Sequence, residues 1–545
     1  MKSSDRISVV TISYIANSSE ANQRVKIMMV YLTRFRRPLA AAAALLMSLM
    51  LVGSLAASEG DTLVVGYGPQ PPSLDPHVTT VIPANTLARN IFETLVTLDE
   101  DMKIQPGLAQ SWSVSEDGRM YRFTLRPGVK FHNGQPLTAT DAVASLERWQ
   151  RYSLPGKNVF QGATWQAEEE HTVVLSLPTP RFNVLDTLAS GIAQSAVIMP
   201  ASIATAAAEK PLTQYIGTGP FRLVDWQQDQ MMELQRYEGY TSFGGTQSGT
   251  AGDRTPTCGK IQIVFVKDES TRTLGLTTGE YDVANPLPYD SITEVQENDA
   301  LKLGSYASTM LNLSFNQEKS GFFRDKRARQ AINIGIDRLP ILTAAAIDQR
   351  FFRLNNHLMM RNQKQWTTEV GDTEFNPVDA PNAKRLLKEA GYDGRQLILI
   401  TTRDYVEMYN SAIVIQQQLQ NLGVNVKVES YDWATFVKVR ANKEAWDLMV
   451  LSVGPKSDPS QLVSLNKDFP GGPRDMQLED ILARIRKAAT MEDAQDLYRK
   501  LEGWNQSYVP SVRIGEVDYV FAMSKRVQSI QVQNDLILWT TRLSN

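Results

Sequence analysis

The chain contains very few cysteine and histidine residues, and these shortages exclude several kinds of protein. Of its 545 residues, one is cysteine (Cys258) and four are histidine. A lone cysteine cannot close an internal disulfide, so no disulfide framework supports the fold. The histidines, His77, His132, His171 and His357, are widely separated, and none forms a helix-spaced pair. We therefore expect no cofactor and no metal site made of protein ligands.

An excess of basic residues is also missing. The chain has 56 Lys and Arg against 59 Asp and Glu. Removing residues 1–57 takes away seven basic and two acidic residues and leaves a net charge of −8. Proteins that bind nucleic acid need a basic footprint, so no nucleic-acid partner is expected.

Catalytic signatures are absent as well. The sequence contains no G-x-S-x-G elbow, no H-E-x-x-H motif and no cysteine–histidine constellation. Cys258 lies in the stretch 244–259, which is rich in Gly, Ser and Thr and predicts an exposed, flexible loop with an inert thiol. We expect a protein without catalysis of its own, with a hydrolase as the weaker alternative.

No hydrophobic run after the N-terminal region is long enough to cross a bilayer, and the N-terminal region itself resembles a signal peptide. The basic stretch Arg34–Arg37 precedes an apolar run, Leu39–Val52, and Ser54–Ala56 offers small residues for cleavage. A membrane-spanning helix needs about 20 apolar residues, so this run is too short for a permanent anchor. We expect residues 1–57 to be a signal peptide that sends the protein to the periplasm; its export route stays open.

Residues 1–27 are polar and match no targeting signal, so we expect translation to start at Met28 or Met29. No cysteine follows the signal segment to carry a lipid, which favours a free protein. The 488 residues after position 57 are too many for one hydrophobic core, so at least two domains are expected.

The most informative stretch of the chain is 112–145. It predicts a strand, a tight turn at Asp117-Gly118, a second strand over 121–125, and a helix capped by Thr138 or Thr140. A second informative block spans 216–240.

The second block begins with Gly217-Thr218-Gly219, and Pro220 opens a strand with alternating apolar positions. A glycine-rich loop can bind phosphate, but the pattern G-x-x-x-x-G-K-[ST] is absent and the run enters a strand rather than a helix. We interpret it as a scaffold turn.

Together, these two blocks resemble the peptide/nickel family of solute-binding proteins that serve ABC importers, family 5. The resemblance covers nearly all of the chain after the signal segment. It implies an α/β, two-lobe periplasmic binding protein fold (class II-like, large cluster C type) with mixed sheets, an extra subdomain in the first lobe and a hinged cleft. It also implies a monomer that captures a small molecule or short peptide and delivers it to ABC transporter permease subunits at the inner membrane.

The resemblance and the pattern of elements give the expected domain limits. Lobe I spans 58–305 and includes an extra subdomain at about 101–210, lobe II spans 306–508, and residues 509–545 return to lobe I. Strands and amphipathic helices alternate in the second lobe, which indicates a parallel component in its sheet.

Several aromatic and polar residues are candidates for the walls of the cleft. Tyr67 ends the first strand, and Gln70 lies in the Pro-rich loop that follows, which lines the cleft in the resembled family. An ordinary Pro-rich connection is the alternative for this loop. Tyr405, Tyr431 and Trp433 are further candidate aromatic walls, with core packing as the alternative.

Arg403 and Asp404 follow a buried strand, 397–400, at a position from which the resembled family reaches into the cleft. Arg403 can clamp a carboxylate with two hydrogen bonds. A surface ion pair between Arg403 and Asp404 is the alternative.

The loop that binds the ammonium group of peptides in the resembled family departs from the family pattern here. Pro455 stands where dipeptide binders have an Asp, and Lys456 follows it. An ammonium beside Lys456 would be repelled, although Asp458 or Asp404 could substitute for the missing carboxylate. A carboxylate-bearing solute, such as an anionic or modified peptide, fits Arg403 and Lys456 better.

Other cargoes and roles stay open. The resembled family also carries chelated metal, and a metal inside a small chelator needs few protein ligands. An oligosaccharide and a chaperone-like function toward unfolded chains are further alternatives.

Overall fold

The computed structural model describes residues 61–544 except Pro69, Ile192, Ala193, Glu209, Ser320 and 371–375. The chain divides into two units, Met1–Glu59 and Gly60–Asn545, and the second is described here by itself. The expected signal peptide and the expected starts at Met28 or Met29 lie outside the described residues. Within the described residues, no helix has both the length and the apolar character that a membrane crossing requires.

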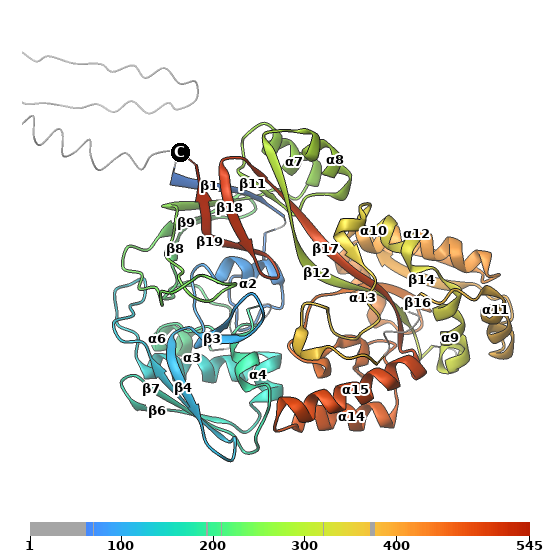
Figure 1. Ribbon diagram of the computed structural model, residues 1–545, viewed down its shortest axis with the longest axis horizontal. Coiled ribbons are helices and arrows are strands. Elements are labelled where there is room, and N and C mark those ends of the chain that lie inside the picture. Colours follow the sequence, from blue (N-terminus) through green and yellow to red (C-terminus); the bar gives the residue numbers. More distant parts are fainter. Residues whose placement is uncertain are drawn as a thin grey trace, which may run out of the picture. The chain divides into compact units, whose positions relative to one another are not determined.

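In the described part of the chain, one mixed sheet has eleven strands (Figure 1). Its order is β15-β14-β16-β12-β17-β11-β1-β10-β9-β8, and β13 pairs with β17. Strand β1 is parallel to β10 and β11, and β14 is parallel to β15 and β16, which confirms the predicted parallel component. The bounds are β1 (Thr62–Tyr67), β8 (Phe221–Gln227), β9 (Met231–Arg236), β10 (Lys260–Phe265), β11 (Val283–Asn285), β12 (Leu301–Phe315), β13 (Phe352–Arg353), β14 (Leu397–Thr402), β15 (Val426–Tyr431), β16 (Leu448–Val453) and β17 (Ser511–Ser524).

The two longest strands, β12 and β17, join the halves of this sheet. They run antiparallel along nearly their whole length, with register shifts at Ala307/Thr309 and Leu311/Asn312. Strand β12 pairs with β16 on one side, and β17 pairs with β11 on the other (Figure 1). This arrangement of two halves linked by crossing strands agrees with the expected α/β two-lobe fold.

A separate four-stranded sheet, β4-β5-β7-β6, contains the predicted hairpin. Gly118 has a φ of 67° in its turn, a conformation that costs glycine little. Thr138 caps the following helix in a capping box with Asp141, so the first of the two expected caps is correct. The bounds are β4 (Ala109–Val114), β5 (Met120–Leu125), β6 (Thr164–Glu169) and β7 (Thr172–Ser176), and the small pairs are β2 (Val96–Leu98) with β3 (Ile104–Pro106) and β18 (Val527–Val532) with β19 (Leu536–Leu543).

Most helices cover the faces of these sheets. Asp325 and Asp379 cap α9 and α11 by accepting from Arg327 N and Asn382 N. Helix α9 stops at Gly335, and Asp337 caps α10 by accepting from Leu339 N. The helices are α2 (Ile82–Ala88), α3 (Ala139–Tyr152), α4 (Leu154–Val159), α5 (Val184–Ala189), α6 (Ala201–Ala207), α7 (Glu269–Thr277), α8 (Ile292–Glu297), α9 (Lys326–Gly335), α10 (Arg338–Ala346), α11 (Ala380–Glu389), α12 (Val406–Asn421), α13 (Trp433–Ala441), α14 (Met476–Lys487) and α15 (Met491–Tyr508). Short 3-10 turns are η2 (Tyr289–Ser291), η3 (Phe322–Arg324), η4 (Gln349–Phe351), η5 (Lys364–Trp366), η6 (Pro459–Gln461) and η7 (Val463–Leu465).

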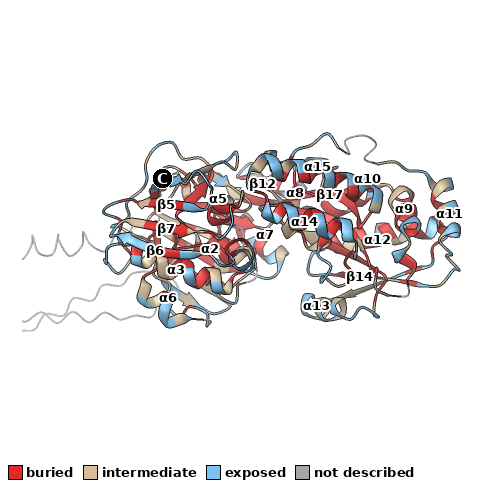
Figure 2. Ribbon diagram, turned by 90° about the horizontal axis from the view of Figure 1, so that it is seen from below, coloured by how far each residue is buried: buried red, intermediate tan, exposed pale blue. Residues whose placement is uncertain are grey.

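Buried apolar side chains of the described residues form four clusters. Figure 2 shows where buried stretches lie along the strands and helices. Two of the clusters flank the two halves of the large sheet. A third, the subdomain core, lies between the four-stranded sheet, α3 and α5. The fourth, the helical core, lies between α14, α15 and η5. Several separate cores are what the chain length predicts; the exact lobe limits stay a prediction.

The stretch 244–259 is packed, so the prediction of an exposed flexible loop is wrong. Thr250 N donates to Leu98 O at 2.9 Å, and Arg254 donates to Arg89 O at 2.8 Å while lying over the Trp539 ring. Cys258 is fully buried, and burial raises the pKa of its thiol to about 12. A thiol that stays protonated is a poor nucleophile, as expected for an inert cysteine.

Candidate functional site

The carboxyl ends of β14, β15 and β16 meet at one edge of the large sheet. The three strands are parallel, with Thr402 opposite Tyr431 at their ends. Ligands of open α/β sheets bind outside the carboxyl ends of the strands. Seven of the nine residues predicted for the ligand site lie at or just after these strand ends, which we call the β14–β16 edge: Arg403, Asp404, Tyr405, Tyr431, Trp433, Lys456 and Asp458.

Backbone contacts hold the first two loops of this edge together. Arg403 N donates to Tyr431 O at 3.3 Å, and Asp404 Oδ2 accepts from Trp433 N at 2.8 Å. The carboxylate of Asp404 therefore fixes the start of α13, and the expected alternative pair with Arg403 is not formed.

The Arg403 guanidinium is exposed and lies 5.5 Å from the Tyr409 ring. No carboxylate of the described residues lies within ion-pair distance of it. A guanidinium in this position can accept a carboxylate from a ligand.

Two aromatic rings at the edge are half-open to solvent. Tyr405 is 38% exposed and Trp433 is 37% exposed, and their rings meet edge to face at 5.1 Å. Trp433 also stacks on Phe436 at 5.5 Å. Tyr431 differs, because its hydroxyl donates to Glu429 Oε2 at 2.7 Å and this bond raises its pKa to about 12. Tyr405 and Trp433 thus form the available aromatic wall.

Lys456 is half-buried in the loop after β16, and burial lowers the pKa of its ammonium. Its ammonium makes no ion pair with any described residue, whereas its carbonyl accepts from Gln363 Nε2 at 2.6 Å. A desolvated ammonium without a counter-charge is costly. The small void beside it is lined mainly by apolar and amide side chains, among them Met310, Asn312, Met359 and Met360.

Asp458 is buried, and its carboxylate is already fully used. Oδ1 accepts from Ser460 N at 2.9 Å and Ser460 Oγ at 2.6 Å. Oδ2 accepts from Gln461 Nε2 at 2.7 Å and from Asn183 Nδ2 at 2.9 Å. Because a carboxylate offers about four lone-pair positions, this residue has no capacity for a ligand ammonium.

The structure does not bring Tyr67 and Gln70 to this edge. Tyr67 is buried, its hydroxyl donates to Asp535 Oδ2 at 2.7 Å, and burial raises its pKa. Gln70 Oε1 accepts from Trp226 Nε1 at 2.9 Å and Asp229 N at 2.8 Å, and its amide donates to Gln228. Their polar groups make contacts within the fold and not at this edge, and a ligand-binding role for either residue stays a prediction.

The Pro-rich loop that contains Gln70 is held in place by a buried ion pair with α3. Arg148 donates to both oxygens of Asp75, at 3.1 and 2.7 Å, and both side chains are buried. The loop therefore fits the alternative of an ordinary, tightly held connection.

Sequence reasoning missed Glu407, a buried acid in the first turn of α12. Its side chain is 3% exposed, and Oε1 accepts from Ser452 Oγ at 3.1 Å. Burial raises its pKa to about 7, and no cation of the described residues compensates its charge. A Glu in a first helical turn is ordinary; the available signal was its position right after a buried strand.

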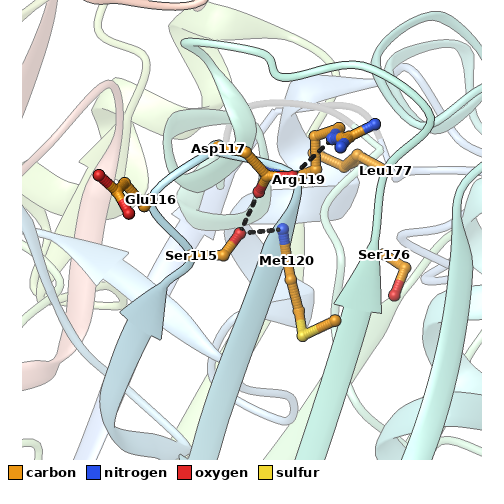
Figure 3. A pocket seen from close by; sticks show the side chains of 7 residues that line it. All are labelled: Ser115, Glu116, Asp117, Arg119, Met120, Ser176 and Leu177. Atoms are coloured by element: carbon orange, nitrogen blue, oxygen red, sulfur yellow. Dashed lines mark hydrogen bonds and ion pairs between the residues drawn. The ribbon is translucent and has the colours of Figure 1, made fainter.

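A surface hollow of about 520 Å³ lies at the β4–β5 hairpin rather than at this edge (Figure 3). Ser115 Oγ donates to Asp117 Oδ1 at 2.6 Å and accepts from Met120 N at 2.9 Å, and Arg119 donates to Asp117 at 2.7 Å. These groups satisfy one another within the turn, as Figure 3 shows, so the hollow offers little to a ligand. Within the described residues, no three His, Cys, Asp or Glu side chains gather as a metal cage.

Comparison with known proteins gives the family context. The sequence model of the bacterial extracellular solute-binding proteins, family 5, matches residues 103–471. A probable peptide ABC transporter periplasmic-binding protein of Sinorhizobium fredii is 27% identical over 85% of this chain and 90% of its own length. The glutathione-binding protein GsiB of Pectobacterium atrosepticum is 27% identical over 87% of this chain and 92% of its own.

Solved structures share the fold. The PBP AgaA from A. tumefacien R10, in complex with agropinic acid, has a TM-score of 0.74 at 24% identity and covers 89% of this chain and 99% of its own. The dipeptide binding protein from Pseudoalteromonas sp. SM9913, in complex with Met-Leu, has a TM-score of 0.75 at 19% identity and covers 89% of this chain and 100% of its own. Both likenesses support the two-lobe fold.

Proposed function

This chain belongs to family 5 of the bacterial extracellular solute-binding proteins, and from this premise we propose that it is the periplasmic receptor of an ABC importer. It captures a peptide-like solute that carries a carboxylate, at the β14–β16 edge, and delivers it to the membrane permease. One observation carries the ligand class: two cations at this edge, Arg403 and Lys456, make no ion pair with a described residue.

The acids of the edge support the same ligand class. Asp404 is bonded to Trp433 N, and Asp458 already accepts four hydrogen bonds. A ligand ammonium beside Lys456 would therefore find the nearby carboxylate of Asp458 fully occupied. A ligand carboxylate would instead gain charge-assisted hydrogen bonds, which are the strong ones.

Aromatic side chains give the edge an apolar surface for the body of the solute. The rings of Tyr405 and Trp433 are partly exposed at the same strand ends as Arg403. Ligand pockets combine apolar and aromatic walls with a few polar groups that fix orientation. The names of the relatives include glutathione, and one neighbour holds agropinic acid; both compounds are acids, which is consistent with this assignment.

The test is direct measurement of solute affinity. Native mass spectrometry identifies any solute that copurifies, and calorimetry measures its Kd, with glutathione and Met-Leu as the first probes. We expect Arg403→Ala and Lys456→Ala each to weaken binding of an acidic solute about tenfold or more, the worth of one charge-assisted hydrogen bond. Arg385→Ala and Lys384→Ala, on the exposed face of α11, are matched controls and should keep the wild-type Kd.

If both edge variants bind the identified solute as the wild type does, the proposed ligand class is wrong. Recovery of the solute unchanged after incubation supports a binder, and recovery of a cleaved product supports the hydrolase alternative. A monomer in size-exclusion chromatography and a mature N-terminus near Ala57 complete the proposal. A mature N-terminus upstream of Leu39 would contradict the expected signal peptide.

A further inference from the structure

Three consecutive residues, Arg181-Phe182-Asn183, connect the subdomain core to the helical core. They lie between β7 and α5. Arg181 donates to Arg486 O, Phe182 N donates to Ala488 O at 3.0 Å, and Asn183 donates to Asp458 at 2.9 Å. Each of the three residues therefore contacts a segment 275 to 306 positions away in the chain.

The contact of Asn183 is buried. Asn183 is 5% exposed and Asp458 is 1% exposed. Asn183 is also the residue before α5, but its side chain makes no cap to that helix. Its amide is thus free for Asp458, and a hydrogen bond to a buried carboxylate is among the stronger ones.

Phe182 supports the same loop through a second residue. Its ring meets Trp366 edge to face at 5.9 Å, and Trp366 Nε1 donates to Ser457 O at 3.1 Å. Gln363 holds the preceding carbonyl, that of Lys456, at 2.6 Å. The Lys456–Asp458 loop is therefore fixed at each of its three residues.

A surface hollow with both charged and apolar lining residues is bordered by Asp186 of α5 and by Lys364 and Gln365 of η5. It has a volume of about 480 Å³ and is lined by Asp101, Lys103, Asp186, Lys364 and Gln365, among others. Lys364 Nζ lies 2.6 Å from Asp101 across it, an exposed pair of small worth. The hydrogen bond from Asn183 to Asp458, by contrast, is a buried direct link between the two cores.

We propose that Arg181-Phe182-Asn183 is a clasp, and that Asn183 is a positioning residue for Lys456. The clasp stabilises the arrangement in which the two cores meet, and it sets the Lys456–Asp458 loop in its ligand-binding position only in that arrangement. The second statement rests on the proposed function, because it takes Lys456 as a ligand contact. When only a fraction of the protein is in the state that binds solute, the apparent affinity is lower by that fraction. By stabilising this state, the clasp raises the apparent affinity without contacting the solute.

The test measures the distance between the cores without solute. Spin labels are placed at Ala167→Cys on β6 and Lys500→Cys on α15, both exposed positions. Because Cys258 is buried, these two introduced cysteines are the reactive thiols. Double electron–electron resonance then gives the ratio of short to long distances between the two spin labels. We expect Asn183→Ala and Asn183→Asp to lower that ratio about tenfold, and hydrogen exchange of residues 456–461 to become faster.

An exchange of roles provides the rescue. Asn183→Asp combined with Asp458→Asn restores an amide–carboxylate pair between positions 183 and 458. The side-chain oxygen at position 458 can still accept from Ser460, so the short distance between the labels should return. Asn421→Asp, on the exposed end of α12, is the matched control and should leave the ratio unchanged. Wild-type distances in both Asn183 variants, or only long distances in the wild type, would overturn the clasp.

The two proposals fail separately. If Lys456→Ala weakens solute binding while Asn183→Ala keeps the wild-type distances, the clasp is wrong and the proposed function stands. If Asn183→Ala lengthens the distances while Lys456→Ala binds solute normally, the clasp stands and Lys456 loses its role as a ligand contact.

Discussion

At the scale of single residues, burial shifts the pKa values of two side chains far enough to make the stability of the fold depend on pH. His77 is fully buried, its Nε2 lies 2.9 Å from Val197 O, and its Nδ1 has no partner among the described residues. Burial lowers its pKa to about 4, against 6.5 for the free side chain. Glu407 shows the opposite shift, with a pKa raised to about 7.

His77 should make the fold less stable as the pH falls. Above pH 6.5 the ring is neutral in both states and contributes no pH dependence; between 6.5 and 4 the unfolded chain takes up a proton that the folded one refuses. The difference in unfolding free energy between wild type and His77→Gln should fall by about 2 kcal/mol from pH 7 to pH 5. Urea unfolding at both pH values checks this, and a constant difference would contradict it.

Glu407 should have the reverse effect. The pKa of Glu407 in the folded protein exceeds the unfolded value of 4.5. As the pH rises from 4.5 to 7, the unfolded chain therefore loses a proton that the folded protein keeps, and the free energy of unfolding falls. Relative to the wild type, Glu407→Gln should gain about 3 kcal/mol of stability between pH 5 and pH 8. Thermal or urea unfolding of both proteins gives this difference. Equal pH profiles would show that Glu407 is not held neutral.

At the scale of elements, the two sequence blocks that indicated the family prove to be one structural unit. His132 N donates to Gly217 O at 2.9 Å, and the His132 ring lies 3.0 Å from Gly219 O. The ring also meets Tyr237 edge to face at 5.0 Å. The turn around Gly217 is therefore a scaffold contact, as its lack of a phosphate-binding pattern indicates.

Gly217 should tolerate no side chain. A Cβ there would lie 2.1 Å from Ile91 O, a backbone atom that cannot move aside. We expect Gly217→Ala to lower the free energy of unfolding by about 2 kcal/mol or more. Gly503 in α15 is the matched control, because a Cβ there meets nothing within 4 Å; Gly503→Ala should stabilise by roughly 0.5–1 kcal/mol. Equal effects in urea unfolding would contradict the close contact.

Local elements could be predicted from the sequence because their signals are local. Thr138 and Asp325 cap helices through atoms two or three residues away. The packing of 244–259 could not be predicted, because Arg254 finds Arg89 and Trp539 in remote segments. A loop rich in small polar residues has no local signal for such anchors.

The residues of the candidate site also divide into those with a local sequence signal and those whose contacts come from remote segments. That Arg403 and Trp433 lie together could be predicted, because they follow buried strands that are parallel, and parallel strands bring their carboxyl ends to one edge. The hydrogen bond of Tyr67 could not be predicted, because its partner Asp535 lies 468 positions later in the chain. The full set of donors to Asp458 could not be predicted either, because Asn183 belongs to another core.

At the scale of the whole molecule, the large sheet continues from one half to the other through β12 and β17. Both strands have register shifts near their middle, and such bulges bend a strand locally. Bending there changes the distance between the halves while the cores on either side stay packed. Hinged closure around a ligand is a motion for which such binding proteins are known.

Solute binding should therefore compact the protein. We expect the radius of gyration from solution scattering to fall when the copurified solute, or glutathione as a probe, is added to solute-free protein, because a ligand that touches both halves favours the closed form. Arg403→Ala at the same solute concentration should show less compaction. Superimposable scattering curves for the wild type with and without its solute would contradict this motion.

The place of β17 in the chain has a consequence for biogenesis. This strand begins at Ser511, near the carboxyl terminus, yet it pairs with β11 and β12, which precede it by some two hundred residues. A ribosome or an export channel releases the chain from its amino end, so the early strands emerge long before their neighbour. Neither half of the sheet can complete its strand pairing until Ser511–Ser524 has emerged. A chain truncated before Ser511 should leave two unpaired strand edges and be prone to aggregate.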